Sequence, residues 1–146
     1  MWLVYALSAA VLWGVSYAAC GKVIERGMAP LSFFFLYALC GAIAGGCALA
    51  ATGKLAGLGT EIRSIGDSNI WLIVALISSA AGTLLIYMAI GEKNATLASL
   101  IEISYPIFVA FFTWLFFREM QLSLSTFAGG ALILSGVAVV YLGNSK

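Results

Sequence analysis

One ionisable side chain, Glu102, lies deep within a long apolar run, eight residues after Asn94 and well before Arg118. A charged group at the centre of a membrane helix costs about 2.5 to 3.5 kcal/mol on insertion scales, so it usually faces a cavity or a partner. Such a carboxylate suits a carrier of protons or the counter-ion of a cationic solute. The alternative is a structural role, in which Glu102 hydrogen-bonds to a neighbouring helix, for example to a serine or threonine of the third apolar run, and only holds the helices together.

The residues around Glu102 predict a small and polar helix face. Pro106 has no N–H group and leaves the carbonyl of Glu102 without its helical donor, so we expect a bend beside the carboxylate. A kink that serves packing alone is the alternative for Pro106. At about 100° per residue, the face that carries the carboxylate comprises Ala95, Ser99, Glu102, Pro106, Val109 and Thr113.

Two aromatic residues of the first apolar run extend this candidate site. Trp13 and Tyr17 share one helix face, and we expect them to line the same cavity as Ser99 and Glu102, with Tyr105 at its edge. Aromatic walls suit flat or cationic solutes. Interfacial or packing aromatics are the alternative. The predicted binding residues for a substrate or a proton are therefore Glu102, Ser99, Tyr105, Trp13 and Tyr17.

The sequence lacks the residue patterns that metal binding, disulfide formation and phosphate binding require. The chain has no histidine, and its three cysteines, Cys20, Cys40 and Cys47, sit in apolar runs without metal-ligand or disulfide spacing, so we expect them to be packing residues. There is no glycine-rich loop with lysine and serine or threonine to hold phosphates. We therefore predict neither an enzyme nor a metal site nor a cofactor.

The composition indicates that water is not the main solvent of this chain. It is 63% hydrophobic and 9% charged, whereas soluble domains carry about 25% charged residues. The net charge is +1 and the basic residues are scattered, which argues against nucleic acid as a partner. The lipid bilayer is the predicted environment.

Five apolar runs are long enough to cross a membrane, whose hydrocarbon layer of about 30 Å takes about 20 helical residues. Backbone groups there must be paired within their own segment, so each run is expected to be a helix. We predict one all-α, multi-pass domain over residues 1–146, with a flexible surface loop over 53–68. Trp71 and Tyr87 suit the headgroup zone at the ends of the third run. The predicted spans are 1–21, 30–52, 70–90, 94–117 and 122–142.

Small residues recur at spacings that favour close helix contacts, although glycines are also simply common in membrane helices. They are Gly41, Gly45, Ser78, Ser79, Gly82, Thr83, Ala131 and Ser135.

The flanking charges give almost no orientation signal. With five spans the loops form two sets, and the positive-inside rule compares their lysines and arginines. One set holds three, Lys54, Arg63 and Arg118, and the other holds four, Lys22, Arg26, Lys93 and Lys146. We therefore hypothesise dual topology, in which copies insert both ways round and pair antiparallel as an inverted repeat. A fixed topology set by the insertion machinery or a partner chain is the alternative.

Several residues resemble a known family. They are Trp13 and Gly14, Lys22 and Pro30 at the first hairpin, Pro106, Glu119, the run 129–134, and Gly136. Together they look like a single EamA-type domain of the drug/metabolite transporter superfamily, and the resemblance covers nearly the whole chain.

The resemblance implies half of a ten-helix inverted-repeat transporter, because typical members fuse two such five-helix domains. Pairing as a homodimer, antiparallel in the dual-topology case, or as a heterodimer with a similar half is therefore implied. Lys22 and Glu119 match family positions near helix ends, where interfacial anchoring is the expected role. Small multidrug-resistance relatives use a glutamate on their first helix, and this chain has none there, so Glu102 is not equated with it.

The expected function is secondary transport of small organic solutes, as an exporter or exchanger, coupled to protons through Glu102. The expected location is the inner membrane of a bacterium or archaeon. Two alternatives stay open: a membrane subunit that does not transport, and a flippase subunit for a lipid-linked substrate.

Overall fold

The structure, a computed structural model, describes residues 1–119 and 123–144. Within these residues the chain is helical, with turns and no strand, and five helical spans are long and apolar enough to cross a membrane. The prediction of an all-α membrane protein is therefore confirmed. Leu122, the predicted start of the fifth span, and Lys146 of the charge comparison lie outside the described residues.

The first two spans form a helical hairpin of α1 (Trp2–Glu25) and α2 (Pro30–Ala51). Gly27 takes φ 102° in the connecting turn, which glycine adopts without steric cost. Pro30 begins α2, at a position where a missing N–H group is harmless. α1 runs past the predicted end at residue 21, and an ion pair of 2.8 Å joins Lys22 Nζ to Glu25 Oε2 on its last turn.

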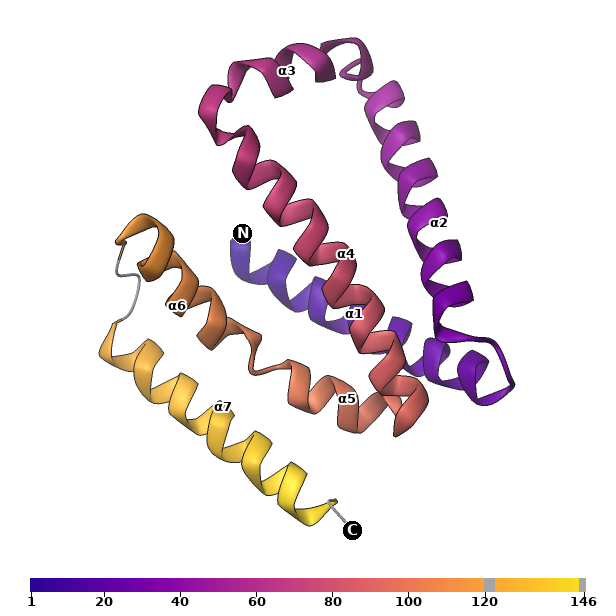
Figure 1. Ribbon diagram of the computed structural model, residues 1–146, viewed down its shortest axis with the longest axis vertical. Coiled ribbons are helices and arrows are strands. Elements are labelled where there is room, and N and C mark those ends of the chain that lie inside the picture. Colours follow the sequence, from indigo (N-terminus) through magenta and orange to yellow (C-terminus); the bar gives the residue numbers. More distant parts are fainter. Residues whose placement is uncertain (120–122, 145–146) are drawn as a thin grey trace.

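The connection from α2 to α4 (Asn69–Glu92) is helical, so the prediction of a flexible loop is wrong. It contains η1 (Leu55–Gly57), α3 (Leu58–Ser64) and η2 (Gly66–Ser68), and Figure 1 shows it arching between the two long helices. Glu61 lies in the first turn of α3 and Arg63 in its last, where each charge opposes the helix dipole favourably. Mixed charge alone does not distinguish a loop from a short amphipathic helix.

The predicted span 94–117 is two helices, α5 (Ala95–Glu102) and α6 (Tyr105–Phe117), with a break at residues 103–104. α5 begins at a cap in which the Leu97 N–H donates to Asn94 Oδ1 over 2.9 Å. α7 (Leu124–Gly143) starts in the same way, because the Thr126 N–H donates to Ser123 Oγ over 3.1 Å. Such caps satisfy donors that the first helical turn leaves free.

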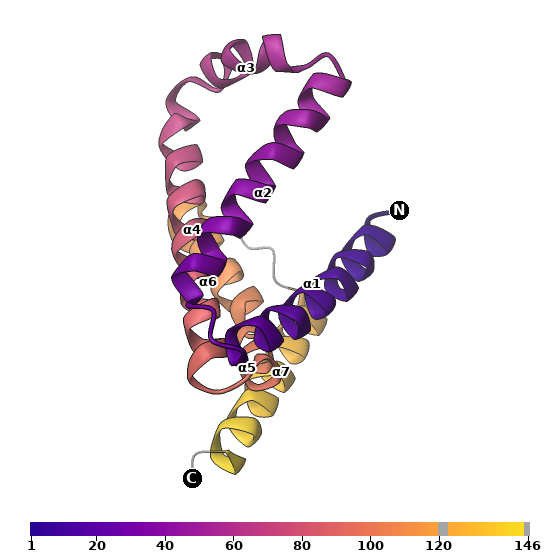
Figure 2. The ribbon, with the colours of Figure 1, turned by 90° about the vertical axis from the view of Figure 1, so that its right-hand side faces the viewer.

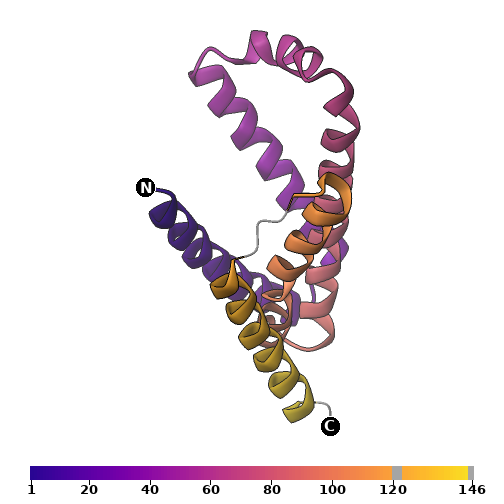
Figure 3. The same ribbon diagram turned by 90° about the vertical axis from the view of Figure 1, so that its left-hand side faces the viewer.

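The helices pack tightly at one end of the molecule only. Figures 2 and 3 show α1 and α2 diverging from the end at which they are joined. At that end a Cβ on Gly21 of α1 would lie 3.1 Å from the Ala95 Cβ of α5, and one on Gly91 of α4 would lie 3.2 Å from the Pro30 ring. The buried residues of the described chain are Tyr17, Cys20, Ile86, Tyr87, Ile90 and Ala98. The core is therefore small.

Most of the predicted small-residue contacts are not formed among the residues that the structure describes. A Cβ at Gly41, Gly45 or Gly82 would meet nothing within 4 Å. Ser78 donates to the Val74 carbonyl over 2.6 Å, and Ser135 donates to its own helix likewise. A hydroxyl that finds an acceptor one turn back needs no neighbouring helix, so the spacing of these residues did not identify the packing faces.

Candidate functional site

Glu102 is joined to the first helix by a hydrogen bond. The Tyr17 hydroxyl donates to Glu102 Oε2 over 2.7 Å, between residues 85 apart in sequence. Tyr17 is buried, with 9% of its surface exposed, and Glu102 is half-buried. The hydrogen bond to a neighbouring helix that the structural alternative expected is therefore formed, but the partner is a phenol of α1 and not a serine or threonine of the third span. The long phenol side chain reaches across to the carboxylate, whereas the short hydroxyl of Ser78 in the third span donates to its own helix.

The carboxylate sits at the break between two helices. Glu102 is the last residue of α5, and Pro106 lies in the first turn of α6. Because Pro106 has no N–H, it cannot donate to the Glu102 carbonyl. The Ser104 hydroxyl donates to the Ile101 carbonyl over 2.9 Å and closes the turn. The break therefore places a free backbone acceptor beside a carboxylate within a membrane-spanning segment, and such breaks form binding sites in transporters.

Tyr17 belongs to a set of five aromatic rings in contact, contributed by three helices. We call this set the aromatic cluster: Trp13, Tyr17, Phe33, Tyr37 and Tyr87. Ring centroids of Trp13 and Tyr17 lie 5.4 Å apart, and those of Trp13 and Tyr37 lie 6.4 Å apart. Tyr87 meets Tyr37 and Phe33 edge-on at 5.8 and 4.9 Å. Edge-to-face pairs of this spacing stabilise a cluster beyond the burial of their area.

Tyr87 is the centre of this packing and not an interfacial aromatic as predicted. It is fully buried, with 0% exposure, and its hydroxyl is without a hydrogen-bond partner in the described part of the chain. The prediction was wrong because a tyrosine near the end of an apolar run fits the headgroup zone and a helix-crossing point equally well. In this protein α1, α2 and α4 cross near the C-terminal end of α4, where Tyr87 lies.

A cavity of about 270 Å³ opens beside the Tyr17–Glu102 pair, between α1 and α5. Trp13 and Tyr17 form its aromatic wall, and Thr96 and Ser99 form its polar edge. Ser99 donates its hydroxyl to the Thr96 carbonyl over 3.0 Å, so its oxygen is still free to accept. The remaining lining residues are small: Ala10, Gly14, Ala18 and Ala95. Their size leaves room for a solute.

The structure thus brings together four of the five predicted binding residues. Trp13, Tyr17 and Ser99 line the cavity. Glu102 lies outside the lining, contrary to the prediction, and is connected to the cavity by its hydrogen bond to Tyr17. Tyr105 is 60% exposed and lies outside the lining, because the break turns α6 away after Ser104. Lys22 and Glu119 lie at the ends of α1 and α6, outside this cavity.

Among the site residues with polar side chains, three were not predicted: Tyr37, Tyr87 and Thr96. The tyrosines carry a usable signal, since phenols within apolar runs are candidates for a polar partner. Thr96 carried none, because its position depends on the rotation of α5. In the described residues, no group of three or more His, Cys, Asp or Glu side chains is placed to hold a metal ion.

Comparison with known proteins gives one match. The sequence model of the EamA-like transporter family matches residues 1–142. Searches of curated proteins and of solved structures gave no match.

Proposed function

Because the chain belongs to the EamA-like transporter family, we propose that it exports or exchanges small organic solutes as a dimer, with proton coupling at Glu102. The family makes it a multi-pass membrane transporter of small solutes. The inner membrane of a bacterium or archaeon is the proposed location. Direction, coupling and pairing are parts of the proposal.

The hydrogen bond from Tyr17 to Glu102 is the observation that carries this proposal. An ionised carboxylate only accepts hydrogen bonds, and a protonated one also donates. Hydrogen bonds to ionised groups are stronger than neutral ones, so protonation of Glu102 weakens its contact with Tyr17. That contact joins α1 to α5, the two helices that enclose the cavity. Loading a proton therefore loosens the cavity wall.

Tyr17 also connects solute binding to the protonation of Glu102. Tyr17 lines the cavity and also holds the carboxylate. A solute that hydrogen-bonds to the Tyr17 hydroxyl or to Ser99 competes for this geometry. Proton and solute are thus linked through one side chain, and a ligand shifts an equilibrium only by such differential contacts.

Pairing is supported by how little the chain buries by itself. Neither α2 nor α7 has a buried residue. Two copies in opposite orientations would supply the inverted repeat that transporters use for alternating access, and the near balance of flanking charges permits both orientations.

Exchange across vesicle membranes tests the coupling. Wild-type protein and Glu102→Gln are reconstituted, a pH gradient is imposed, and uptake is followed for amino acids, nucleosides and organic cations. Wild-type protein is expected to move at least one class in response to the gradient, and Glu102→Gln to lose that response. Glu92→Gln is the matched control, because Glu92 is exposed at the end of α4. Equal gradient-driven uptake by wild type and Glu102→Gln would refute the coupling.

Reporter fusions at the C-terminus test the pairing orientation. Dual topology predicts reporter activity on both sides of the membrane in comparable amounts. A reporter found on one side only removes the antiparallel homodimer and leaves a parallel pair or a different partner.

A further inference from the structure

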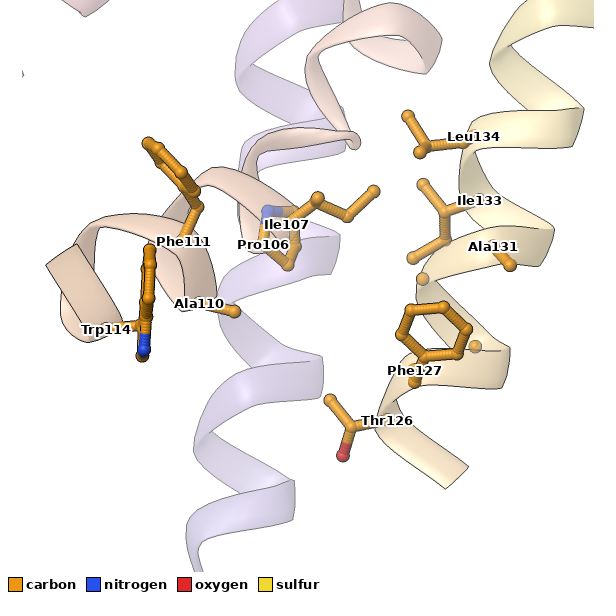
Figure 4. Close-up of a pocket in the computed structure, with 12 residues that line it drawn as sticks. Pro106, Ile107, Ala110, Phe111, Trp114, Thr126, Phe127, Ala131, Ile133 and Leu134 are labelled. Carbon is orange, nitrogen blue, oxygen red and sulfur yellow. The ribbon is translucent and has the colours of Figure 1, made fainter. Parts of the chain in front are cut away.

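A second cavity lies on the other side of the break, in a groove between α6 and α7. Its volume is about 570 Å³, within the range of pockets that hold organic ligands. Figure 4 shows Ile107 of α6 pointing across it toward Ile133 and Leu134 of α7, whereas Phe111 and Trp114 lie farther along α6. Thr126 is the one lining residue with a polar side chain apart from the Trp114 indole.

The groove extends through half of the membrane. On α6 it begins at Trp114 and ends at Pro106, which is the middle residue of the span Ala95–Phe117. On α7 it ends at Leu134, near the middle of Leu124–Gly143. Eight residues of helix correspond to about 12 Å, close to the depth of one leaflet, about 15 Å. At the inner end, a Cβ on Gly130 would touch Ile107 Cγ1 at 3.5 Å.

The outer end of the groove lies at headgroup level. Trp71 packs against Phe116 and Phe117 with ring centroids 5.3 and 4.8 Å apart, and tryptophan at span ends marks the membrane interface. Arg118 follows directly, and its guanidinium carbon lies 5.5 Å from the ring centre of Trp114. A cation is thus held at the mouth of an apolar groove.

The backbone at Arg118 fixes this placement. Among the described residues it is the one non-glycine with positive φ, 58°, a conformation that costs energy for a residue with a Cβ. Its N–H donates to the Trp114 carbonyl over 3.0 Å, which ends α6. No ion pair involves Arg118 in the described part of the chain. Its guanidinium therefore forms no salt bridge there, although the exposed carboxylate of Glu119 is the next side chain in the sequence. A strained residue of this kind is a candidate for function.

We propose that this groove binds an anionic phospholipid of the surrounding leaflet, with one acyl chain along α6 and α7 and the phosphate on Arg118. The length of the groove favours a lipid over a second copy of the chain. An acyl chain extends through one leaflet, as the groove does, whereas a transmembrane helix of a second copy would cross both leaflets. The charge of Arg118 favours an anionic headgroup, because a guanidinium that is not engaged in a salt bridge can hold a phosphate with two hydrogen bonds.

Quenching of Trp114 fluorescence by phospholipids with brominated acyl chains tests this site. Trp2, Trp13 and Trp71 are replaced by phenylalanine, and the protein is placed in phosphatidylcholine vesicles with increasing brominated phosphatidylglycerol or brominated phosphatidylcholine. Half-maximal quenching is expected at about a fivefold lower fraction of the anionic lipid, the preference that one basic residue at a membrane surface gives. Equal curves for the two lipids would overturn the proposal.

Matched variants separate the headgroup contact from the groove. Arg118→Gln is expected to remove the anionic preference and Arg118→Lys to keep most of it. Arg63→Gln, an exposed arginine of α3, should leave it unchanged. Gly129→Leu is expected to fill the groove and lower quenching by both lipids. Gly136→Leu is its control, since a Cβ meets nothing within 4 Å at either glycine and Gly136 lies outside the lining.

Two further results would also overturn the proposal. One is an anionic preference that survives Arg118→Gln. The other is Gly129→Leu converting a dimer into a monomer, by mass in detergent, without any change in lipid preference, which would assign the groove to a second copy. If the background that keeps only Trp114 does not fold, native mass spectrometry of lipid retained by wild type and Arg118→Gln gives the same comparison.

Discussion

The two halves of the broken helix differ in what they contact. α5 packs on α1, α4 and α7 and carries a buried residue, Ala98, and its last residue bonds to Tyr17. α6 has no buried residue, and its face toward α7 is an open apolar groove. The first half is completed by this chain, and the second is completed by whatever surrounds it. A helix break beside a carboxylate thus separates a polar, protein-lined region from an apolar, lipid-facing one.

Among the substitutions that test this difference, truncation of the Tyr87 ring is expected to have the largest effect on stability. Tyr87→Ala removes a fully buried side chain and should lower the free energy of unfolding by about 3 to 5 kcal/mol, the cost of deleting a buried aromatic ring. Tyr141→Ala, at a residue 62% exposed, should change it little. Denaturant titration of both variants in detergent micelles measures the difference. Equal losses would mean that the cluster does not hold the helices together.

Removal of the phenol hydroxyl at Tyr17 is expected to have the next largest effect. Tyr17→Phe deletes the donor to Glu102, and a hydrogen bond to a charged group contributes about 1.5 to 3 kcal/mol. The same titration measures the loss. In the Glu102→Gln background the loss should shrink, because an amide accepts more weakly than a carboxylate. A loss of the same size in both backgrounds would show that Tyr17 acts through packing alone.

The close approach of α1 and α5 gives a third comparison. Gly21→Val places a side chain where a Cβ already lies 3.1 Å from Ala95, and overpacking of this kind costs about 1 to 3 kcal/mol. Gly136→Val on α7 is the control, since a Cβ there meets nothing within 4 Å. Thermal unfolding in detergent, followed by circular dichroism, compares them. A lower midpoint for the control than for Gly21→Val would place the tight packing on α7 instead.

The sequence predicts the helices and the break between α5 and α6 better than it predicts the contacts on either side of the break. Length and apolarity locate the helices to within a few residues, and the chemistry of Pro106 locates the break. The partner of Glu102 was not predictable, because Tyr17 lies 85 residues away and a pairing at that distance depends on how α1 rotates against α5. The groove was not predictable either, because glycines such as Gly129 and Gly130 are equally compatible with a close helix contact and with an open groove.

The smallest expected effect is a stabilisation, and it distinguishes Tyr87 from Tyr17 within the cluster. Tyr87 has a buried hydroxyl without a partner, and an unsatisfied buried polar group costs about 1 to 3 kcal/mol. Tyr87→Phe keeps the ring contacts with Phe33 and Tyr37 and removes only that oxygen, so unfolding should become harder by up to about 1 kcal/mol. Tyr17→Phe makes the same chemical change at a hydroxyl that has a partner.

The stability difference between these two variants therefore measures the carboxylate contact against a matched background. If Tyr87→Phe destabilises the protein, its hydroxyl has a partner in the membrane, such as a bound water, and the polar region extends from Glu102 into the α4 core. If it stabilises the protein while gradient-driven uptake is unchanged, the polar function of the cluster resides in Tyr17 and Glu102, and Tyr87 contributes packing.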